Sequence, residues 1–131
     1  QNSQTIPFES ADYNHGLKVA KGLLKLNPKG IELEYQVQDS FVGVFKSDVK
    51  NILVSYKDLE SIHFKKGWFS DKISLKTSSL QLMQELPGTE QGECVLKVKR
   101  KHREEARQTI SQARIGLSEQ KLDQLGEHGE E

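Results

Sequence analysis

The chain has 131 residues, a length that fits one domain. Hydrophobic residues make up 34% and charged residues 29% of it, so we expect a polar but globular domain with a small core. The 19 basic and 19 acidic side chains cancel, and this balance argues against a dedicated nucleic-acid-binding protein, which is normally basic overall.

Cysteine usage and the apolar runs bear on the compartment. The single cysteine, Cys94, excludes an internal disulfide, and a reducing, cytoplasmic compartment is the simplest prediction. The longest apolar runs are a few residues, far below the roughly 20 needed to span a bilayer, and no signal peptide is evident. Because the chain begins at Gln1 and its only methionine is Met83, we expect a trimmed or processed form, or part of a longer protein.

The first part of the chain predicts a leader followed by a hairpin. Residues 1–16 show little periodicity, and we expect a flexible leader there. Residues 17–26 and 31–38 both alternate apolar and polar side chains, which is typical of strands with one buried face. Asn27-Pro28-Lys29-Gly30 supplies turn residues between them, so the two runs predict a β-hairpin.

Five further short strands are predicted beyond this hairpin. The corner at 57–60, the turn at 65–71 and the loop at 87–92 interrupt the apolar alternation. These connections are too short for crossover helices, so the seven strands in total should form a mostly antiparallel sheet. The five strands are expected at 52–56, 62–64, 73–77, 80–82 and 94–98.

The last quarter of the chain changes to a helical period. Ala106, Ile110, Ala113 and Leu117 fall on one stripe of an α-helix. We expect Gly116 to end this helix and Ser118 to cap a short helical extension, and residues 118–131 to finish in a frayed acidic tail.

Seven antiparallel strands followed by one amphipathic helix is the element order of the pleckstrin-homology (PH) superfold. Residues 22–33 resemble the opening hairpin of the GRAM and bacterial PH-like families, and residues 52–62 resemble their third strand, corner and fourth strand. The resemblance implies a mainly β domain over residues 17–117, a PH-like β-roll capped by the C-terminal helix. Because this superfold hosts many unrelated binding roles, the resemblance implies a binding module without naming a partner.

The chain departs from phosphoinositide-binding PH domains in one respect. Those domains carry clustered lysine and arginine on the first two strands and the loop between them. Here the loop offers only Lys29, and the second strand carries Glu32 and Glu34. A multiply charged headgroup needs several convergent cations, so we do not expect phosphoinositide recognition at that position.

Catalytic and metal-binding chemistry find no support in the sequence. The histidines, at positions 15, 63, 102 and 128, show no metal-ligand spacing. Cys94 lies on the predicted inward face of a strand, where a free thiol packs as a small hydrophobe. No nucleophile elbow, P-loop or dinucleotide-binding glycine motif is present, so we expect no enzyme, no metal and no cofactor.

A basic run near the helix start is the strongest charge feature. One use for it is docking on anionic lipid, worth about 1 kcal/mol per side chain near the surface. The alternatives, which we favour here, are a solvated strand edge and pairing with the acidic tail that starts at Glu119. The run comprises Lys97, Lys99, Arg100, Lys101, Arg103 and Arg107.

Two apolar loops form the more informative feature. The connection at 39–48 carries Phe41 and Phe45, and the turn at 66–71 carries Trp68 and Phe69. In an up-and-down sheet both loops emerge at one end, where they would form an exposed apolar patch. The alternative is that residues 41–45 fold back as a minor strand and cover Trp68. The sequence leaves both open.

These features predict a non-catalytic PH-like interaction domain acting through protein–protein contacts, including self-association. Phe41, Phe45, Trp68 and Phe69 are the expected anchors, with Lys65 and Lys66 at the rim. The alternative is a peripheral membrane-binding module that uses the same loops and the basic run. Salt dependence separates the two, because docking driven by lysine weakens as salt rises. An apolar ligand inside the roll has no sequence feature in its favour.

Overall fold

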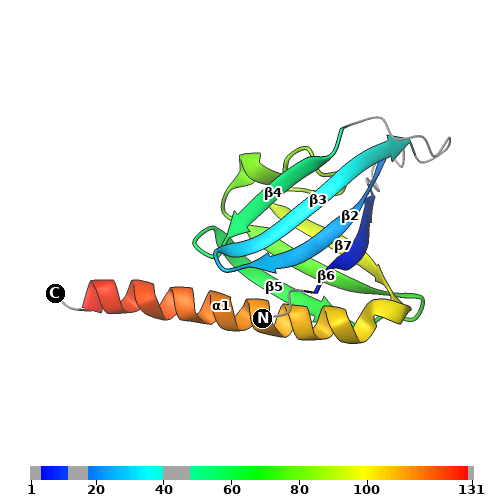
Figure 1. The fold of residues 1–131 in the computed structure, drawn as a ribbon. Coiled ribbons are helices and arrows are strands. Elements are labelled where there is room, and N and C mark those ends of the chain that lie inside the picture. The colour runs from blue at the N-terminus through cyan, green and yellow to red at the C-terminus, as the bar shows by residue number, and fades with distance from the viewer. Residues whose placement is uncertain (1–3, 12–17, 40–47, 130–131) are drawn as a thin grey trace.

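The computed structural model describes residues 4–11, 18–39 and 48–129, and their side chains as far as residue 126, apart from Ala11. Within these ranges the chain forms seven antiparallel strands in one open sheet, in the order β4-β3-β2-β1-β7-β6-β5, and one long C-terminal helix (Figure 1). The predicted mainly β fold is therefore confirmed. Its elements are β1 (Ile6–Ala11), β2 (Lys18–Asn27), β3 (Gly30–Asp39), β4 (Lys50–Ser55), β5 (Leu59–Lys65), β6 (Ser70–Thr77) and β7 (Glu93–Lys99), the 3₁₀ turns η1 (Leu80–Met83) and η2 (Arg100–His102), and α1 (Arg103–Gly129).

The sheet consists of two meanders joined at a narrow seam. β1 to β4 pair consecutively, as do β5 to β7, but β1 and β7 share a single facing pair, Glu9 with Lys97. All seven strands contribute inward-facing side chains to one hydrophobic core, so the sheet bends around that core (Figure 1). β1 and β7 are paired at one point only along the described strands.

The predicted flexible leader is wrong for residues 6–11, which form β1 in the middle of the sheet. Ile6 and Phe8 are buried in the core, and every residue of β1 faces a residue of β2. Two features hid this strand. Pro7 counts against a strand, and the third inward position is the polar Ser10, whose hydroxyl donates a hydrogen bond to the Pro87 carbonyl.

The predicted strand at 80–82 is also wrong, since this segment forms η1. The apolar side chains that matter here are Met83 and Leu86, both fully buried, whereas Leu80 is largely exposed. Their spacing of three suits a tight turn rather than a strand. The Lys50 ammonium of β4 lies 2.8 Å from the Glu85 carboxylate and ties β4 to this segment. The segment thus contributes Met83 and Leu86 to the hydrophobic core.

Helix α1 confirms the predicted apolar stripe but not the predicted break. Ala106, Ile110 and Ala113 are buried against the sheet, with Leu117 the next residue in the stripe. Gly116 does not end the helix, which continues to Gly129 and extends past the sheet (Figure 1). A Cβ at Gly116 would lie only 2.6–2.8 Å from the ring and hydroxyl of Tyr56. The glycine therefore provides room for an aromatic ring, which a sequence pattern does not distinguish from a stop signal.

Candidate functional site

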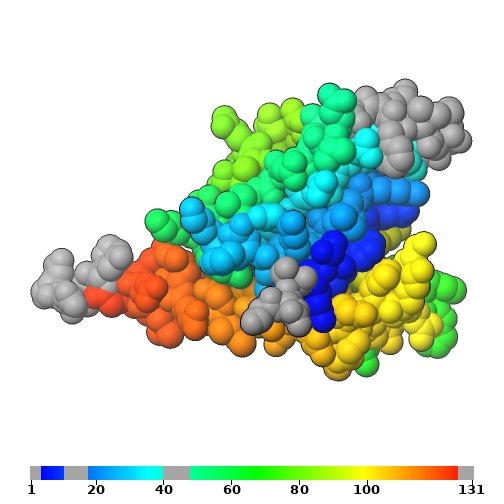
Figure 2. Space-filling model, in the orientation of Figure 1, coloured from blue at the N-terminus to red at the C-terminus, as the bar shows by residue number. Residues whose placement is uncertain are grey.

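The β5–β6 turn carries two aromatic side chains that are exposed to solvent. Trp68 is 83% exposed and Phe69 is 87% exposed, and Lys65 and Lys66 are exposed just before them. In Figure 2 this green turn projects beyond the yellow start of α1. The alternative in which Trp68 is covered is therefore wrong. Phe41 and Phe45 lie outside the described residues, so their share in a joint apolar patch stays a prediction.

An ion pair between a buried carboxylate and a partly exposed arginine holds this turn against the helix. The Asp71 side chain, fully buried at the start of β6, accepts hydrogen bonds of 2.8 Å from both Nε and Nη2 of Arg103. The Gly67 N–H donates to the same carboxylate at 3.0 Å, and Arg103 Nη2 also donates to the Gly67 carbonyl. The Arg103 hydrogen bonds, with that of Gly67, hold the pKa of Asp71 below its usual value. These contacts therefore hold in place the turn that carries the exposed Trp68 and Phe69.

The predicted basic run separates into residues with different roles. Arg103 supports the turn through Asp71, and Arg100 donates from Nη1 to the Trp68 carbonyl at 3.3 Å. Lys97, Lys99 and Lys101 instead line a groove on the outer face. Arg100 and Arg103 thus stabilise the β5–β6 turn, whereas the three lysines of the run line the groove.

A row of lysines crosses the outer face of the sheet. Strand register places Lys65 opposite Lys72, Lys72 opposite Lys97, Lys97 opposite Glu9, and Glu9 opposite Lys21. Directly opposed residues point to the same face, so these five side chains, which we call the lysine row, run across β5, β6, β7, β1 and β2. Glu9 is the one acid of the row, and its carboxylate lies 3.5 Å from the Lys21 ammonium.

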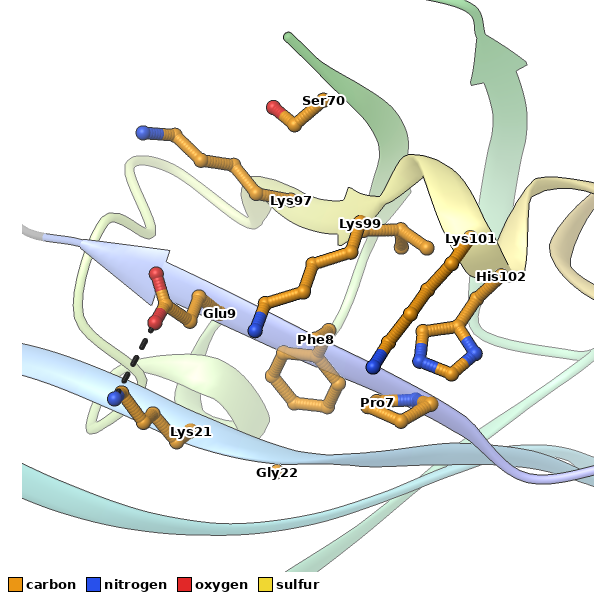
Figure 3. Close-up of a pocket in the computed structure, with 11 residues that line it drawn as sticks. Pro7, Phe8, Glu9, Lys21, Gly22, Ser70, Lys97, Lys99, Lys101 and His102 are labelled. Carbon is orange, nitrogen blue, oxygen red and sulfur yellow. Dashed lines mark ion pairs between the residues drawn. The ribbon is translucent and has the colours of Figure 1, made fainter.

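A groove of 430 Å³ opens along the seam, and we call it the β1–β7 groove. Beyond the Glu9–Lys97 pair the strands separate, because β7 turns into η2. The lining residues of β1 and β2 thus face those of β7 and η2 across the opening (Figure 3). A Cβ at Gly22 would lie 2.0 Å from the Glu34 carbonyl oxygen, so only glycine fits at this point of β2. The lining comprises Pro7, Phe8, Glu9, Lys21, Gly22, Ser70, Lys97, Val98, Lys99, Lys101 and His102.

The sequence interpretation found one side of this site and missed the other. Lys97, Lys99 and Lys101 stood out as a charged run, but Lys21 on the other side belongs to no such run. Pro7 and Phe8 belonged to the supposed leader. The pairing of β1 with β7 brings these residues together. A local sequence pattern does not predict a pairing between strands that lie far apart in the chain.

The buried cysteine and the residue types that ligate metals bear on catalysis and metal binding. Cys94 is buried, as predicted, and burial raises the pKa of its thiol to about 12, so it is not a nucleophile near neutral pH. No group of three or more histidine, cysteine or acidic side chains in the described part of the chain is placed to hold a metal ion. Among the same residues, no helix combines the length and apolar character needed to cross a membrane.

Comparison of the chain with models of protein families, with curated proteins and with solved structures found no match in any of the three. The PH-like resemblance therefore stays a prediction. Any functional proposal for this chain has to be argued from the exposed turn, the lysine row and the β1–β7 groove themselves.

Proposed function

We propose that this chain is a non-catalytic, PH-like interaction module that docks on an anionic membrane surface, at the cytoplasmic side. The observation that carries the proposal is the β5–β6 turn, where Trp68 and Phe69 are 83% and 87% exposed at the end of a row of lysines. The turn would enter the headgroup region while the lysines contact anionic lipid.

The chemistry of both parts suits a membrane interface. Tryptophan places an apolar ring and a polar N–H at the boundary between lipid and water. Each lysine near an anionic leaflet adds about 1 kcal/mol of attraction. Lys65 belongs both to the lysine row and to the approach to the turn, so the charged and the aromatic parts are continuous.

The dimensions of the apolar surface favour a membrane over a protein partner at this turn. A stable protein interface buries about 800 Å² on each partner. Its hot-spot residues are surrounded by contacts that add little binding energy but exclude water. Trp68 and Phe69 instead stand together on a narrow turn, with Lys65 and Lys66 beside them. A small apolar tip behind a charged rim needs no matching surface on a partner.

The test is binding to vesicles of phosphatidylcholine with and without phosphatidylserine, measured by cosedimentation at low salt. We expect binding only with phosphatidylserine. Trp68→Ala/Phe69→Ala should weaken it at least about tenfold, because burying each ring contributes roughly 1.5–3 kcal/mol. Leu80→Ala is the matched control, since Leu80 is also an exposed apolar residue but lies in η1. Absence of binding to either vesicle, or equal binding by all variants, would contradict the proposal.

A second candidate, self-association, rests on a different surface. Ile115, Leu122 and Leu125 are 57%, 65% and 67% exposed, and their offsets of seven and ten residues place them on one face of α1. This stripe lies mostly where the helix extends past the sheet. Light scattering of the purified chain and of Leu122→Glu tests it: a multimer that becomes a monomer in the variant supports this role, and a monomeric parent chain eliminates it.

A further inference from the structure

The β1–β7 groove has the size and lining of a site for a small amphipathic ligand. Its volume of 430 Å³ lies within the range of about 300–1,000 Å³ that is typical of ligand pockets. Pro7, Phe8 and Val98 supply apolar lining, and Gly22 leaves the backbone of β2 bare. The remaining lining residues are polar, and most of them are cationic.

Two of the groove lysines have no partner in the part of the chain that the structure describes. Among the described residues, neither Lys99 nor Lys101 forms a hydrogen bond or an ion pair through its side chain, whereas Lys21 is held by Glu9. Figure 3 shows the side chains of Lys99 and Lys101 extending side by side over Pro7 and Phe8, with His102 next to Lys101. Two ammonium groups thus reach into the groove from one side.

The charge of the lining identifies the class of ligand. Glu9 is the one acid among the lining residues, and the Lys21 ammonium already neutralises it. Lys99 and Lys101 therefore supply two positive charges that no lining residue offsets. A phosphate monoester, with a charge of about −1.5 to −2 near neutral pH, matches two lysine point charges.

The groove is continuous with the exposed turn. Ser70 lines the groove and directly follows Phe69. Arg100, which donates to the Trp68 carbonyl, lies in the chain between Lys99 and Lys101. An anion bound by these two lysines would therefore lie next to the part of the molecule that we place at the membrane.

We propose that the β1–β7 groove binds the phosphate monoester headgroup of an anionic phospholipid through Lys99 and Lys101. This inference rests on the proposed membrane docking and adds the chemical class of lipid that the module selects. Phosphatidylserine then supports docking through charge alone, and a lipid with a terminal phosphate, such as phosphatidic acid, binds more tightly at equal surface charge.

The test uses the whole chain and water-soluble dihexanoyl phosphatidic acid below its micelle concentration, with binding measured by calorimetry. We expect saturable binding that Lys99→Ala/Lys101→Ala weakens at least about tenfold, since the phosphate then loses two charge-assisted hydrogen bonds. Lys29→Ala/Lys57→Ala removes the same charge from exposed lysines that do not line the groove. This control should bind as tightly as the parent chain.

The outcomes separate the groove from the turn. Trp68→Ala/Phe69→Ala should lose vesicle binding and keep its affinity for the soluble lipid. If vesicles bind but the soluble lipid does not, or if both lysine pairs matter equally, the groove proposal is overturned and membrane docking stands. If glycerol 3-phosphate binds as tightly as the soluble lipid and vesicles do not bind, the lipid source is overturned and membrane docking fails with it.

Discussion

Asp71 shows how one residue sets the geometry of the candidate site. Its carboxylate is buried, and three N–H groups from Arg103 and Gly67 satisfy it. Asp71→Asn keeps the shape of the side chain but removes the charge, so we expect a loss of about 1–3 kcal/mol in the free energy of unfolding. Thermal unfolding at neutral pH measures this loss, and Asp123→Asn, an exposed change on α1, should leave the midpoint unchanged.

The same carboxylate predicts a pH dependence. The Arg103 hydrogen bonds lower the pKa of Asp71 in the folded chain, so the folded state holds its proton less tightly than the unfolded state does. The contribution to stability is then fully present above the unfolded pKa and is lost as the pH falls through the folded pKa. The stability difference between the parent chain and Asp71→Asn should therefore shrink between about pH 5 and about pH 2. A constant difference over that window would mean that the charge of Asp71 contributes nothing.

Cys94 offers a probe of the core at the same scale. Its thiol is buried in β7 with a pKa of about 12. Almost none of it is therefore thiolate at neutral pH, and a reagent has little access to it. We expect a thiol reagent at about pH 8 to label the native chain only as fast as the chain opens. Labelling across a urea series should follow the circular dichroism transition, and rapid labelling without denaturant would contradict the burial of Cys94.

At the scale of elements, the helix protects an edge of the sheet. β5 pairs with β6 alone among the described strands, which leaves one side of its backbone open. Arg114 donates from Nη1 to the Ile62 carbonyl at 2.9 Å, and the Lys121 ammonium donates to the Glu60 carbonyl at 3.4 Å. Side chains from α1 thus cover carbonyls that would otherwise be free to pair with another strand.

We expect Arg114→Ala to lower the free energy of unfolding by about 1 kcal/mol and to promote aggregation on heating, because the Ile62 carbonyl loses its donor. Arg107→Ala is the matched control on the same helix, since Arg107 pairs, among the described residues, only with Glu104, one turn away on the surface. Denaturant unfolding and light scattering during heating check both variants. Equal stability and equal aggregation of the two variants would contradict a role of Arg114 in protecting the β5 edge.

Elements with a strict period were predictable from the sequence, and those stabilised by distant contacts were not. Ile31, Leu33 and Tyr35 alternate with polar residues, and their burial follows that alternation. β1 carries the same signal weakened by Pro7 and Ser10, and its place is set by β2 and β7 rather than by its own composition. The position of the β5–β6 turn followed from the periodic strands on either side of it, but the sequence left the exposure of Trp68 open and did not indicate the β1–β7 groove.

At the scale of the whole molecule, the zero net charge conceals a separation of charge. The lysine row and the groove lysines gather on the outer face of β5, β6, β7, β1 and β2. Lysines outnumber the exposed acids of these strands, such as Glu9 and Glu93, and further exposed acids, Glu104, Glu105 and Glu119, lie on α1. Because attraction to a surface depends on the local face and not on the sum, a neutral chain can still dock on an anionic membrane.

This separation makes the position of a charge matter more than its number. Lys72 lies between Lys65 and Lys97 in the lysine row, and Lys57 lies in the β4–β5 turn, at the other end of β5 from Trp68. Lys72→Glu and Lys57→Glu change the net charge equally. At about 1 kcal/mol per charge near the membrane, we expect Lys72→Glu to weaken binding to phosphatidylserine vesicles about 30-fold and Lys57→Glu to have a much smaller effect.

The salt dependence should separate the two variants further. A Debye length of about 10 Å in 0.1 M salt screens the attraction, so binding of the parent chain should fall steeply as sodium chloride is raised. Lys72→Glu removes attraction at the membrane-facing surface and should flatten that dependence, while Lys57→Glu should preserve it. Cosedimentation across a salt series measures both slopes. Equal losses and equal slopes for the two variants would show that net charge alone governs binding, and the lysine row would then have no special part in it.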